Sequence, residues 1–188
     1  MAKFILASAS PRRKELLEST NIIPDLIVPA DVDESLKNKE KLPIYLKRIV
    51  FEKASSIQTK YKDEIILSAD TVVSTHQKIF GKPKDKNDAK KTLNYLSGRN
   101  HNVSTAICVL HKTVKKIKII KTKIKFKKLH LDEINEYLET GEWAGKAGSY
   151  AIQGYAERFI VKISGSYSNV VGLPLYETVK MLKSFKNF

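Results

Sequence analysis

A run of nine residues from Ile65 to Val73 places the strongest constraint on the fold. It reads Ile-Ile-Leu-Ser-Ala-Asp-Thr-Val-Val, so it is apolar over nearly the whole length of one β-strand. A strand with one face in water alternates apolar and polar residues, whereas a continuous apolar run is typical of a strand buried on both faces. The sequence therefore predicts a sheet that is covered on both sides at this strand.

One carboxylate interrupts this apolar run. Burying Asp70 is costly unless its charge is paired, hydrogen-bonded or bound to a cation. An apolar strand does not need a charge for its own packing, so we interpret Asp70 as a functional residue.

Predicted strands and helices alternate along the rest of the chain. Strands are predicted at residues 4–6, 22–29, 103–110 and 159–163, and helices at residues 10–19, 42–58, 85–96, 131–138 and 174–186. Residues 112–127 alternate lysines with apolar residues and fit an antiparallel strand pair, and residues 166–174 are predicted to form a turn. A chain of 188 residues without repeats or long linkers fits one domain. We expect a single α/β domain over residues 1–188, with a central mixed, twisted sheet flanked by helices.

The turn between the first strand and the first helix is a candidate anion site. Ser10 is a good N-cap, and Pro11 suits the first helical position, where its missing N–H costs nothing. Free N–H groups at the helix N-terminus, hydroxyls, Arg12 and Arg13 together favour an anion, with phosphate first. An ordinary capped helix with two solvated arginines explains the same residues, and the local sequence leaves both interpretations open.

Three further segments carry polar groups that suit either a site or a simple loop. Residues 31–34 supply three carboxylates, which are typical of a solubilising turn and also of metal or water ligands; the local sequence favours the turn. Lys82 stands between Gly81 and Pro83, on a turn after a predicted hairpin. The loop at 145–154 is rich in small residues, so it is either a tight connection or a surface that a flat ligand approaches closely, where Gln153 could hydrogen-bond a base edge.

Charge and cysteine content narrow the class of protein. The net charge is +14, yet most of the 34 basic residues are lysines scattered along the chain, and exposed aromatic residues are not interleaved with them. This pattern favours solvated faces over a specific nucleic-acid surface. The single cysteine, Cys108, permits neither an internal disulfide nor a zinc cluster, which favours a reducing compartment. Because no run approaches membrane-spanning length, we expect a cytoplasmic protein.

These features suit one chemistry. The ends of adjacent strands in an open α/β sheet commonly meet at a ligand site. Cations beside carboxylates and hydroxyls suit a polyphosphate bound with a divalent metal. We therefore expect the 8–13 turn, the acidic loop, Asp70, the Lys82 turn and the glycine-rich loop to share one cleft.

Six ordered blocks of the sequence resemble the Maf family of house-cleaning nucleotide pyrophosphatases, whose fold is related to that of inosine triphosphate pyrophosphatases. The resemblance covers about residues 3 to 183. The blocks are Ser8-Ala-Ser-Pro-Arg-Arg13, Ser68-Ala-Asp-Thr-Val-Val73, Gly81-Lys-Pro83, Leu96-Ser-Gly-Arg99 with His101 and Val103, Lys146-Ala-Gly-Ser-Tyr-Ala-Ile-Gln-Gly154 and Ser166-Tyr-Ser-Asn-Val-Val-Gly-Leu-Pro174.

The resemblance implies a metal-dependent hydrolase that cuts a nucleoside triphosphate between its α and β phosphates, releasing the monophosphate and pyrophosphate. It implies that Asp70 is the catalytic proton acceptor and that Glu34 and Asp70 hold a divalent cation, Mg²⁺ or alternatively Mn²⁺. The residues it implies for phosphate binding are Ser8, Arg13, Lys53 and Lys82.

Three positions imply the substrate. Arg12, Thr71 and Gln153 match the branch of the family that hydrolyses dTTP and UTP, whereas Ser149 and Ala151 stand where the family more often has alanine and glycine. A 7-methyl-GTP pyrophosphatase and a nucleotide-binding regulator of cell division without turnover are the alternatives. The expected partners are pyrimidine nucleoside triphosphates, with no specific nucleic acid, no membrane, and a homodimer as an option.

Overall fold

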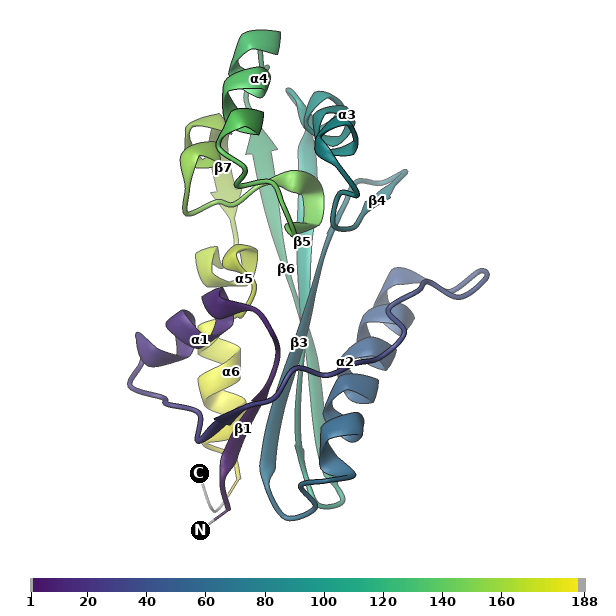
Figure 1. Ribbon diagram of the computed structural model, residues 1–188, viewed down its shortest axis with the longest axis vertical. Helices are drawn as coiled ribbons and strands as arrows, with labels where there is room; N and C mark the ends of the chain where they lie inside the picture. The colour runs from purple at the N-terminus through teal and green to yellow at the C-terminus, as the bar shows by residue number, and fades with distance from the viewer. Residues whose placement is uncertain (1, 186–188) are drawn as a thin grey trace. The chain divides into compact units, whose positions relative to one another are not determined.

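The computed structural model describes residues 2–185 of the chain. The strands are β1 (Phe4–Ala7), β2 (Leu26–Ile27), β3 (Ile65–Ser74), β4 (Ile79–Phe80), β5 (Asn100–His111), β6 (Val114–Phe126) and β7 (Ile160–Ser164). The α-helices are α1 (Pro11–Glu18), α2 (Leu42–Gln58), α3 (Lys86–Leu96), α4 (Leu131–Glu139), α5 (Tyr167–Val171) and α6 (Leu175–Leu182), and two 3₁₀-helices are η1 (Ala147–Ser149) and η2 (Tyr155–Phe159) (Figure 1).

The strands form a mixed sheet in the order β2-β1-β3-β5-β6-β7, with β4 paired to β3. Strand β1 is parallel to both β2 and β3, whereas β4 is antiparallel to β3 and β7 is antiparallel to β6. The predicted α/β class with a mixed sheet and flanking helices is therefore confirmed.

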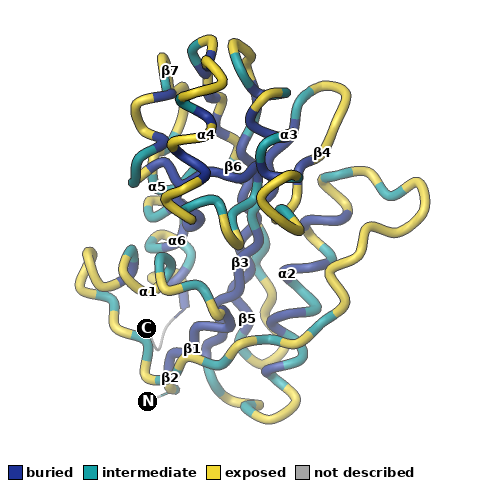
Figure 2. Tube along the Cα trace, turned by 45° about the horizontal axis from the view of Figure 1, so that its top comes forward, coloured by how far each residue is buried: buried dark blue, intermediate teal, exposed yellow. Residues whose placement is uncertain are grey.

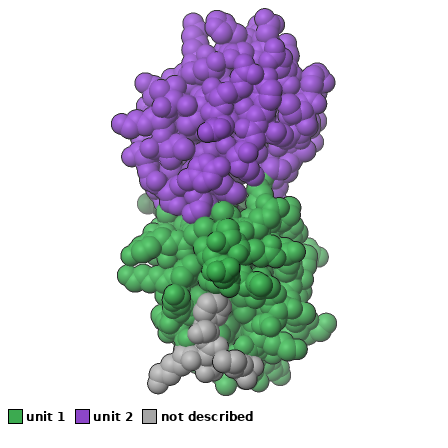
Figure 3. Space-filling view, turned by 90° about the vertical axis from the view of Figure 1, so that its left-hand side faces the viewer, with its two compact units in different colours: residues 1–70, 105–120, 172–188 green, residues 71–104, 121–171 purple. Residues whose placement is uncertain are grey.

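The chain divides into two compact units, which Figure 3 shows in different colours. Unit 1 takes residues 1–70, 105–120 and 172–188, and unit 2 takes residues 71–104 and 121–171. Strands β3, β5 and β6 contribute residues to both units.

Unit 1 has helices on both faces of its strands. On one face, α1 and α6 pack against the strands, and the buried residues of this cluster are Phe4, Leu6, Leu17, Ile65, Leu67, Ala69, Ile107, Val109, Leu173, Leu182 and Phe185. On the other face lies α2 (Figure 1), where the hydroxyl of Ser68 donates a hydrogen bond to the carbonyl of Val50. Successive residues of a strand point to opposite faces, so β3 needs apolar residues at almost every position. This arrangement confirms the prediction made from residues 65–73, and Figure 2 shows β3 buried along this length.

Unit 2 is built around an aromatic cluster and a helix pair. Helix α3 contacts both α4 and η1. The Phe126 ring lies 4.8 Å from the His101 ring and 4.9 Å from the Tyr150 ring, measured between centroids. Asp85 is the N-cap of α3, because its side chain accepts a hydrogen bond from the N–H of Asp88 at 2.8 Å.

Several boundaries differ from the sequence-based expectation. Strand β2 has two residues where residues 22–29 were predicted, because Pro24 and Pro29 have no N–H to donate to a neighbouring strand. The predicted turn at 166–174 contains the short helix α5, which Ser166 begins by accepting a hydrogen bond from the N–H of Asn169 at 3.2 Å.

The last helix and the lysine-rich region also differ. Helix α6 ends at Leu182, where three-residue turns replace the helical bonds, and its predicted end at residue 186 lies outside the described residues. The lysine-rich region forms one long strand, β6, which pairs with β5. Across residues 2–185, every helix falls short of the length and apolar character needed to cross a membrane.

Candidate functional site

Asp70 lies in a buried ion-pair cluster in unit 1. The Nζ of Lys53 is 2.8 Å from Asp70 Oδ1 and 2.9 Å from Glu34 Oε1. Asp70 is 8% exposed and Lys53 is 7% exposed, while the side chain of Glu34 keeps 41% of its surface in contact with solvent. The charge that interrupts the apolar strand is thus compensated by an ammonium group, and the same ammonium holds a second carboxylate beside it.

The periodicity of α2 explains why Lys53 reaches the strand. The buried residues of this helix are Tyr45, Leu46, Ile49, Val50, Lys53, Ala54 and Ile57. They recur at intervals of three and four residues, which is the spacing of one helix face. Lys53 lies on that face and is buried, although a lysine near the end of a helix is normally solvated. The apolar stripe in the sequence was the signal that could have identified it.

The turn after β1 adds a guanidinium group to the same unit. Arg13, in the first turn of α1, donates from Nη1 to Ser8 Oγ at 2.9 Å and from Nε to the carbonyl of Gly172 at 2.9 Å. Burial lowers the pKa of Arg13, while the charges of Asp70 and Glu34 oppose that shift. This electrostatic coupling places the guanidinium within the field of both carboxylates. The carbonyl of Gly172 was not anticipated as an anchor for Arg13.

Strand register explains why Ser8 and Asp70 belong to one site. In the parallel pair β1 and β3, Ala7 lies opposite Ser68. Ser8 therefore lies directly after the carboxyl end of β1, where ligands of open α/β sheets bind, and Asp70 lies two residues beyond Ser68 in β3, which continues past the end of β1 to Ser74. Ser10 lies at the N-cap position as predicted, but its side chain makes no capping bond. Its backbone N–H donates instead to Ser8 Oγ at 3.2 Å.

Unit 2 carries the predicted residues that follow Asp70 in the chain. Thr71 is half-buried, and Lys82 and Gln153 are exposed. The N–H of Gly148 donates to the carbonyl of Gly81 at 3.1 Å, which joins the glycine-rich loop to the turn that carries Lys82.

Gly148 meets a steric requirement in this loop. Its φ is +70°, and a Cβ atom added there would lie 2.7 Å from the Cγ2 of Val73. The loop therefore packs directly against the end of β3, which only a glycine permits.

The predicted residues fall into two groups. The structure brings Ser8, Arg13, Glu34, Lys53 and Asp70 together in unit 1, with Arg12 half-buried beside Arg13 in α1. In unit 2 it joins the Lys82 turn to the glycine-rich loop that also contains Gln153. The expectation that all of these features share one cleft stays a prediction.

Glu34 and Asp70 fit a metal that is shared with a substrate. Among residues 2–185 there is no group of three or more His, Cys, Asp or Glu side chains placed to hold a metal ion. Mg²⁺, however, is commonly bound by one or two carboxylates together with waters and substrate phosphates. Two carboxylates that already converge on one cation, the Lys53 ammonium, match that donor set.

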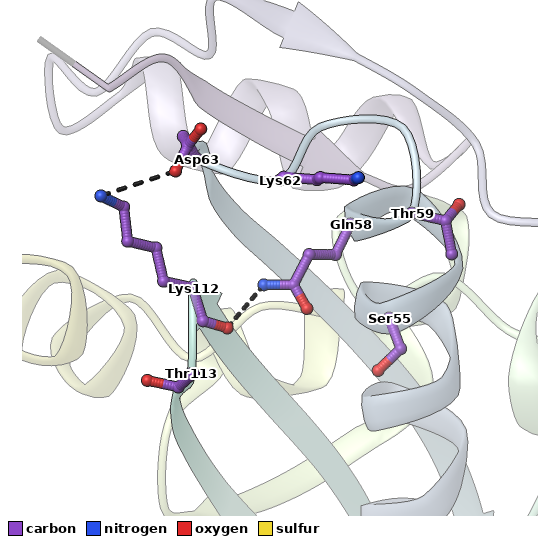
Figure 4. Close-up of a pocket in the computed structure, with 7 residues that line it drawn as sticks. All are labelled: Ser55, Gln58, Thr59, Lys62, Asp63, Lys112 and Thr113. Carbon is purple, nitrogen blue, oxygen red and sulfur yellow. Dashed lines mark hydrogen bonds and ion pairs between the residues drawn. The ribbon is translucent and has the colours of Figure 1, made fainter.

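A different hollow of unit 1 lies beside the C-terminal end of α2 (Figure 4). Its volume is about 460 Å³, and its lining residues are Ser55, Gln58, Thr59, Lys62, Asp63, Lys112 and Thr113. Gln58 donates to the carbonyl of Lys112 at 2.7 Å, and the Lys112 ammonium lies 3.5 Å from Asp63 Oδ1. None of the site residues predicted from sequence lines this hollow.

Comparisons with known proteins identify a family and close relatives of this chain. A family model described as "Maf-like protein" matches residues 3–185. A protein of Mesorhizobium japonicum named "dTTP/UTP pyrophosphatase" is 44% identical over 189 residues, covering 97% of this chain and 91% of the relative. A protein of Rhizobium johnstonii with the same name is 46% identical over 187 residues, covering 96% of this chain and 91% of the relative. A solved structure of a nucleoside-triphosphatase / dITP/XTP pyrophosphatase from Mycobacterium abscessus matches with a TM-score of 0.48 and 11% identity, covering 99% of each chain.

Proposed function

The chain belongs to the Maf-like protein family, and we propose that it hydrolyses dTTP and UTP to the nucleoside monophosphate and pyrophosphate. The observation that carries this proposal is the buried cluster in which Lys53 holds Asp70 and Glu34, just beyond the residues of β3 that pair with β1. Relatives that are 44% and 46% identical over nearly the whole chain are named for this activity. House-cleaning of the nucleotide pool is the cellular role that such an activity would serve.

The unit-1 residues divide the chemistry between them. Asp70 is suited to orient the attacking water and to accept its proton, because a positioned carboxylate is an ordinary general base. Lys53 fixes that carboxylate through the 2.8 Å ion pair and compensates its charge in the buried strand. The Arg13 guanidinium and the Ser8 hydroxyl are suited to hold phosphate oxygens. Attack on a triphosphate is resisted by its negative charge, so these donors lower the barrier electrostatically. We assign Lys82 to phosphate binding as well.

A divalent cation completes this proposal. Glu34 and Asp70 would hold it, with Mg²⁺ the first candidate and Mn²⁺ the second. When bound, such a cation stabilises charge on the phosphate oxygens and on an attacking water. The two carboxylates supply oxygen ligands, which both ions prefer.

We assign base selectivity to Arg12, Thr71 and Gln153. Uracil and thymine present carbonyl acceptors on either side of one N3–H donor, so a selective site needs both donors and an acceptor. The Gln153 amide supplies both, and it is exposed and so accessible to a ligand. Thr71 adds a hydroxyl, and Arg12 adds donors. A buried polar site rejects a mismatched base because its own groups are then left unpaired.

The test is the release of pyrophosphate from a panel of nucleotides, with and without Mg²⁺. We expect dTTP and UTP to be hydrolysed much faster than ATP, GTP or 7-methyl-GTP, and only with the divalent cation. Faster hydrolysis of 7-methyl-GTP would move the protein to the other branch of the family. Nucleotide binding without any pyrophosphate release would favour the regulator.

A pair of glutamine variants tests the base site. Gln153→Ala is expected to reduce the preference for dTTP and UTP more than it weakens triphosphate binding. Gln58→Ala, at the hollow beside α2, is the matched control and should leave the preference unchanged. Equal effects of the two substitutions would refute the assignment of Gln153.

Compartment and partners complete the proposal. We place the protein in the cytoplasm. Cys108 is its single cysteine and is buried, so the chain has no internal disulfide for an oxidising compartment to form. Pyrimidine nucleoside triphosphates are its proposed partners, without a specific nucleic acid. A homodimer stays a prediction.

A further inference from the structure

The acidic loop is held on α2 by two side chains that the sequence did not single out. The hydroxyl of Tyr45 donates to the backbone carbonyl of Glu34 at 3.0 Å. Nη2 of Arg48 donates to the backbone carbonyl of Ser35 at 2.9 Å. Two consecutive carbonyls of the loop are therefore bound by residues that lie nearly one helical turn apart on α2. Figure 1 shows this segment running along α2 before it enters the helix.

Arg48 is itself fixed in place by acidic side chains. Its Nε and Nη2 each lie 2.7 Å from a carboxylate oxygen of Glu40, and its Nη1 lies 3.0 Å from Glu52. Two parallel bonds between a guanidinium and a carboxylate fix the orientation of both groups. The guanidinium also lies 5.6 Å from the centroid of the Tyr45 ring. Tyr45 and Arg48 thus form one rigid clamp on the helix.

The loop needs such a clamp because little else in its structure is regular. Residues 28–37 form neither helix nor strand. Asp33 turns the chain by accepting hydrogen bonds from the N–H and the hydroxyl of Ser35, each at 2.9 Å. The Glu34 carboxylate is substantially exposed, so burial does not determine its position. Fixing a backbone residue costs conformational entropy, so a loop without anchors would lose that entropy each time Glu34 bound a ligand.

We propose that Tyr45 and Arg48 are positioning residues that hold the 33–35 loop on α2, so that the Glu34 carboxylate is already in place for a divalent cation. This inference rests on the proposed function, because it assigns Glu34 to that cation. Both residues act on the backbone of the loop and not on the reacting atoms. Their loss should therefore weaken cation binding more than nucleotide binding.

The test compares Tyr45→Phe and Arg48→Met with wild type in two measurements. The first is Mn²⁺ binding without nucleotide, followed by water proton relaxation. The second is the free Mg²⁺ concentration at half-maximal pyrophosphate release, measured together with KM for dTTP at saturating Mg²⁺. We expect cation affinity to fall by about 10-fold or more in both variants, the range found when groups that support a metal ligand are removed, while KM changes little.

Arg158→Met is the matched control. Arg158 lies in η2, 4.9 Å from the Tyr155 ring and within 4 Å of two glutamates, so it resembles Arg48 in its contacts but belongs to unit 2. We expect this variant to leave cation affinity unchanged. Equal effects in Arg158→Met and Arg48→Met would overturn the proposal.

Amide hydrogen exchange distinguishes failure of the clamp from failure of the proposed function. We expect faster exchange at residues 33–37 in Arg48→Met and Tyr45→Phe, with or without any hydrolytic activity. Unchanged exchange and unchanged Mn²⁺ affinity would refute the clamp even if wild type hydrolyses dTTP. If wild type releases no pyrophosphate, the proposed function fails, and the exchange and Mn²⁺ measurements still decide the clamp. Tyr45→Phe removes one hydroxyl, so it carries the test if Arg48→Met does not fold.

Discussion

Removing the Lys53 ammonium should destabilise the protein far more than removing the charge of Asp70. Lys53→Met keeps a long, unbranched side chain and deletes the cation that two carboxylates share. Asp70→Asn leaves Lys53 paired with Glu34 at 2.9 Å, and the new amide oxygen can still accept a hydrogen bond. The cluster therefore tolerates loss of one acid better than loss of its only shared base.

The burial of each partner sets the magnitude. Breaking a buried ion pair by removing one partner costs about 3–5 kcal/mol, because it leaves an uncompensated charge. Asp70 is 8% exposed and falls in this class, whereas the half-exposed Glu34 can turn to water. We expect Lys53→Met to lower the free energy of unfolding by about 3 kcal/mol. Asp70→Asn should lower it by about 1 kcal/mol. The double variant should recover about 2 kcal/mol of the Lys53→Met loss, since both charges of the buried Lys53–Asp70 pair are then absent.

Urea denaturation followed by far-UV circular dichroism measures these free energies. Lys86→Met is the control, because Lys86 forms an exposed ion pair with Glu139 at 2.6 Å, and such pairs contribute about 1 kcal/mol or less. An additive double variant, or a Lys53→Met loss no larger than that of the control, would refute the reasoning. Either result would mean that Lys53 does not compensate Asp70 in the folded protein.

Further predictions concern activity, pH and the glycine-rich loop. Asp70→Asn should lower the rate of pyrophosphate release by about 100-fold or more, as loss of a general base does. Asp63→Asn, at an exposed aspartate, is the control and should leave the rate unchanged. If the two variants released pyrophosphate at similar rates, Asp70 would not be the general base. Burial lowers the pKa of His101 to about 4, below the roughly 6.5 of an unfolded imidazole, so its contribution to stability is complete above pH 6.5 and is lost as pH falls toward 4. The free energy of unfolding should therefore drop by about 2 kcal/mol between pH 7 and pH 5, and an undiminished drop in His101→Gln would contradict this cause. Gly148→Ala should lower the free energy of unfolding by about 3 kcal/mol, and Gly145→Ala by about 1 kcal/mol. Both glycines have positive φ, but only at Gly148 would the added Cβ meet Val73. Equal losses in the two variants would show that the contact with Val73 does not matter. Duplex DNA should bind weakly and dissociate steeply as salt rises, and sequence-selective binding at physiological salt would contradict the assignment of the +14 charge to solvated faces.

The elements that are marked by a repeating pattern of apolar residues could be predicted from the sequence. Helix α2 has the predicted bounds, because its apolar face repeats over 17 residues. Strand β3 has the predicted burial on both faces, because apolar residues occur on both of its faces. The prediction failed where single hydrogen bonds decide the structure. Strand β2 has only two residues, because the prolines beside it have no N–H to donate. Helix α5 begins directly after Ser166, whose hydroxyl accepts one hydrogen bond.

For the candidate site, the sequence alone suggests residues but not the contacts between them. Asp70 stands out because a charge in an apolar strand must have a partner, yet the sequence alone does not say which one. Lys53 lies on the apolar face of α2, but a lysine near the end of a helix gives no local sign that it pairs with a buried carboxylate. Tyr45 and Arg48 carry no local signal, because their role comes from a loop that folds back along the helix they occupy.

The charges of the unit-1 cluster explain why the proposed reaction should need a metal. Arg13 and Lys53 carry two positive charges, and Glu34 and Asp70 carry two negative charges, so the cluster is formally neutral before a substrate arrives. Lys53 is already paired with both carboxylates, and a triphosphate brings several more negative charges. A divalent cation held by both carboxylates would restore the balance, and it would free Lys53 to interact with the substrate. Metal dependence of pyrophosphate release thus follows from the charge balance of these four side chains, even though two carboxylates alone make only a partial metal site.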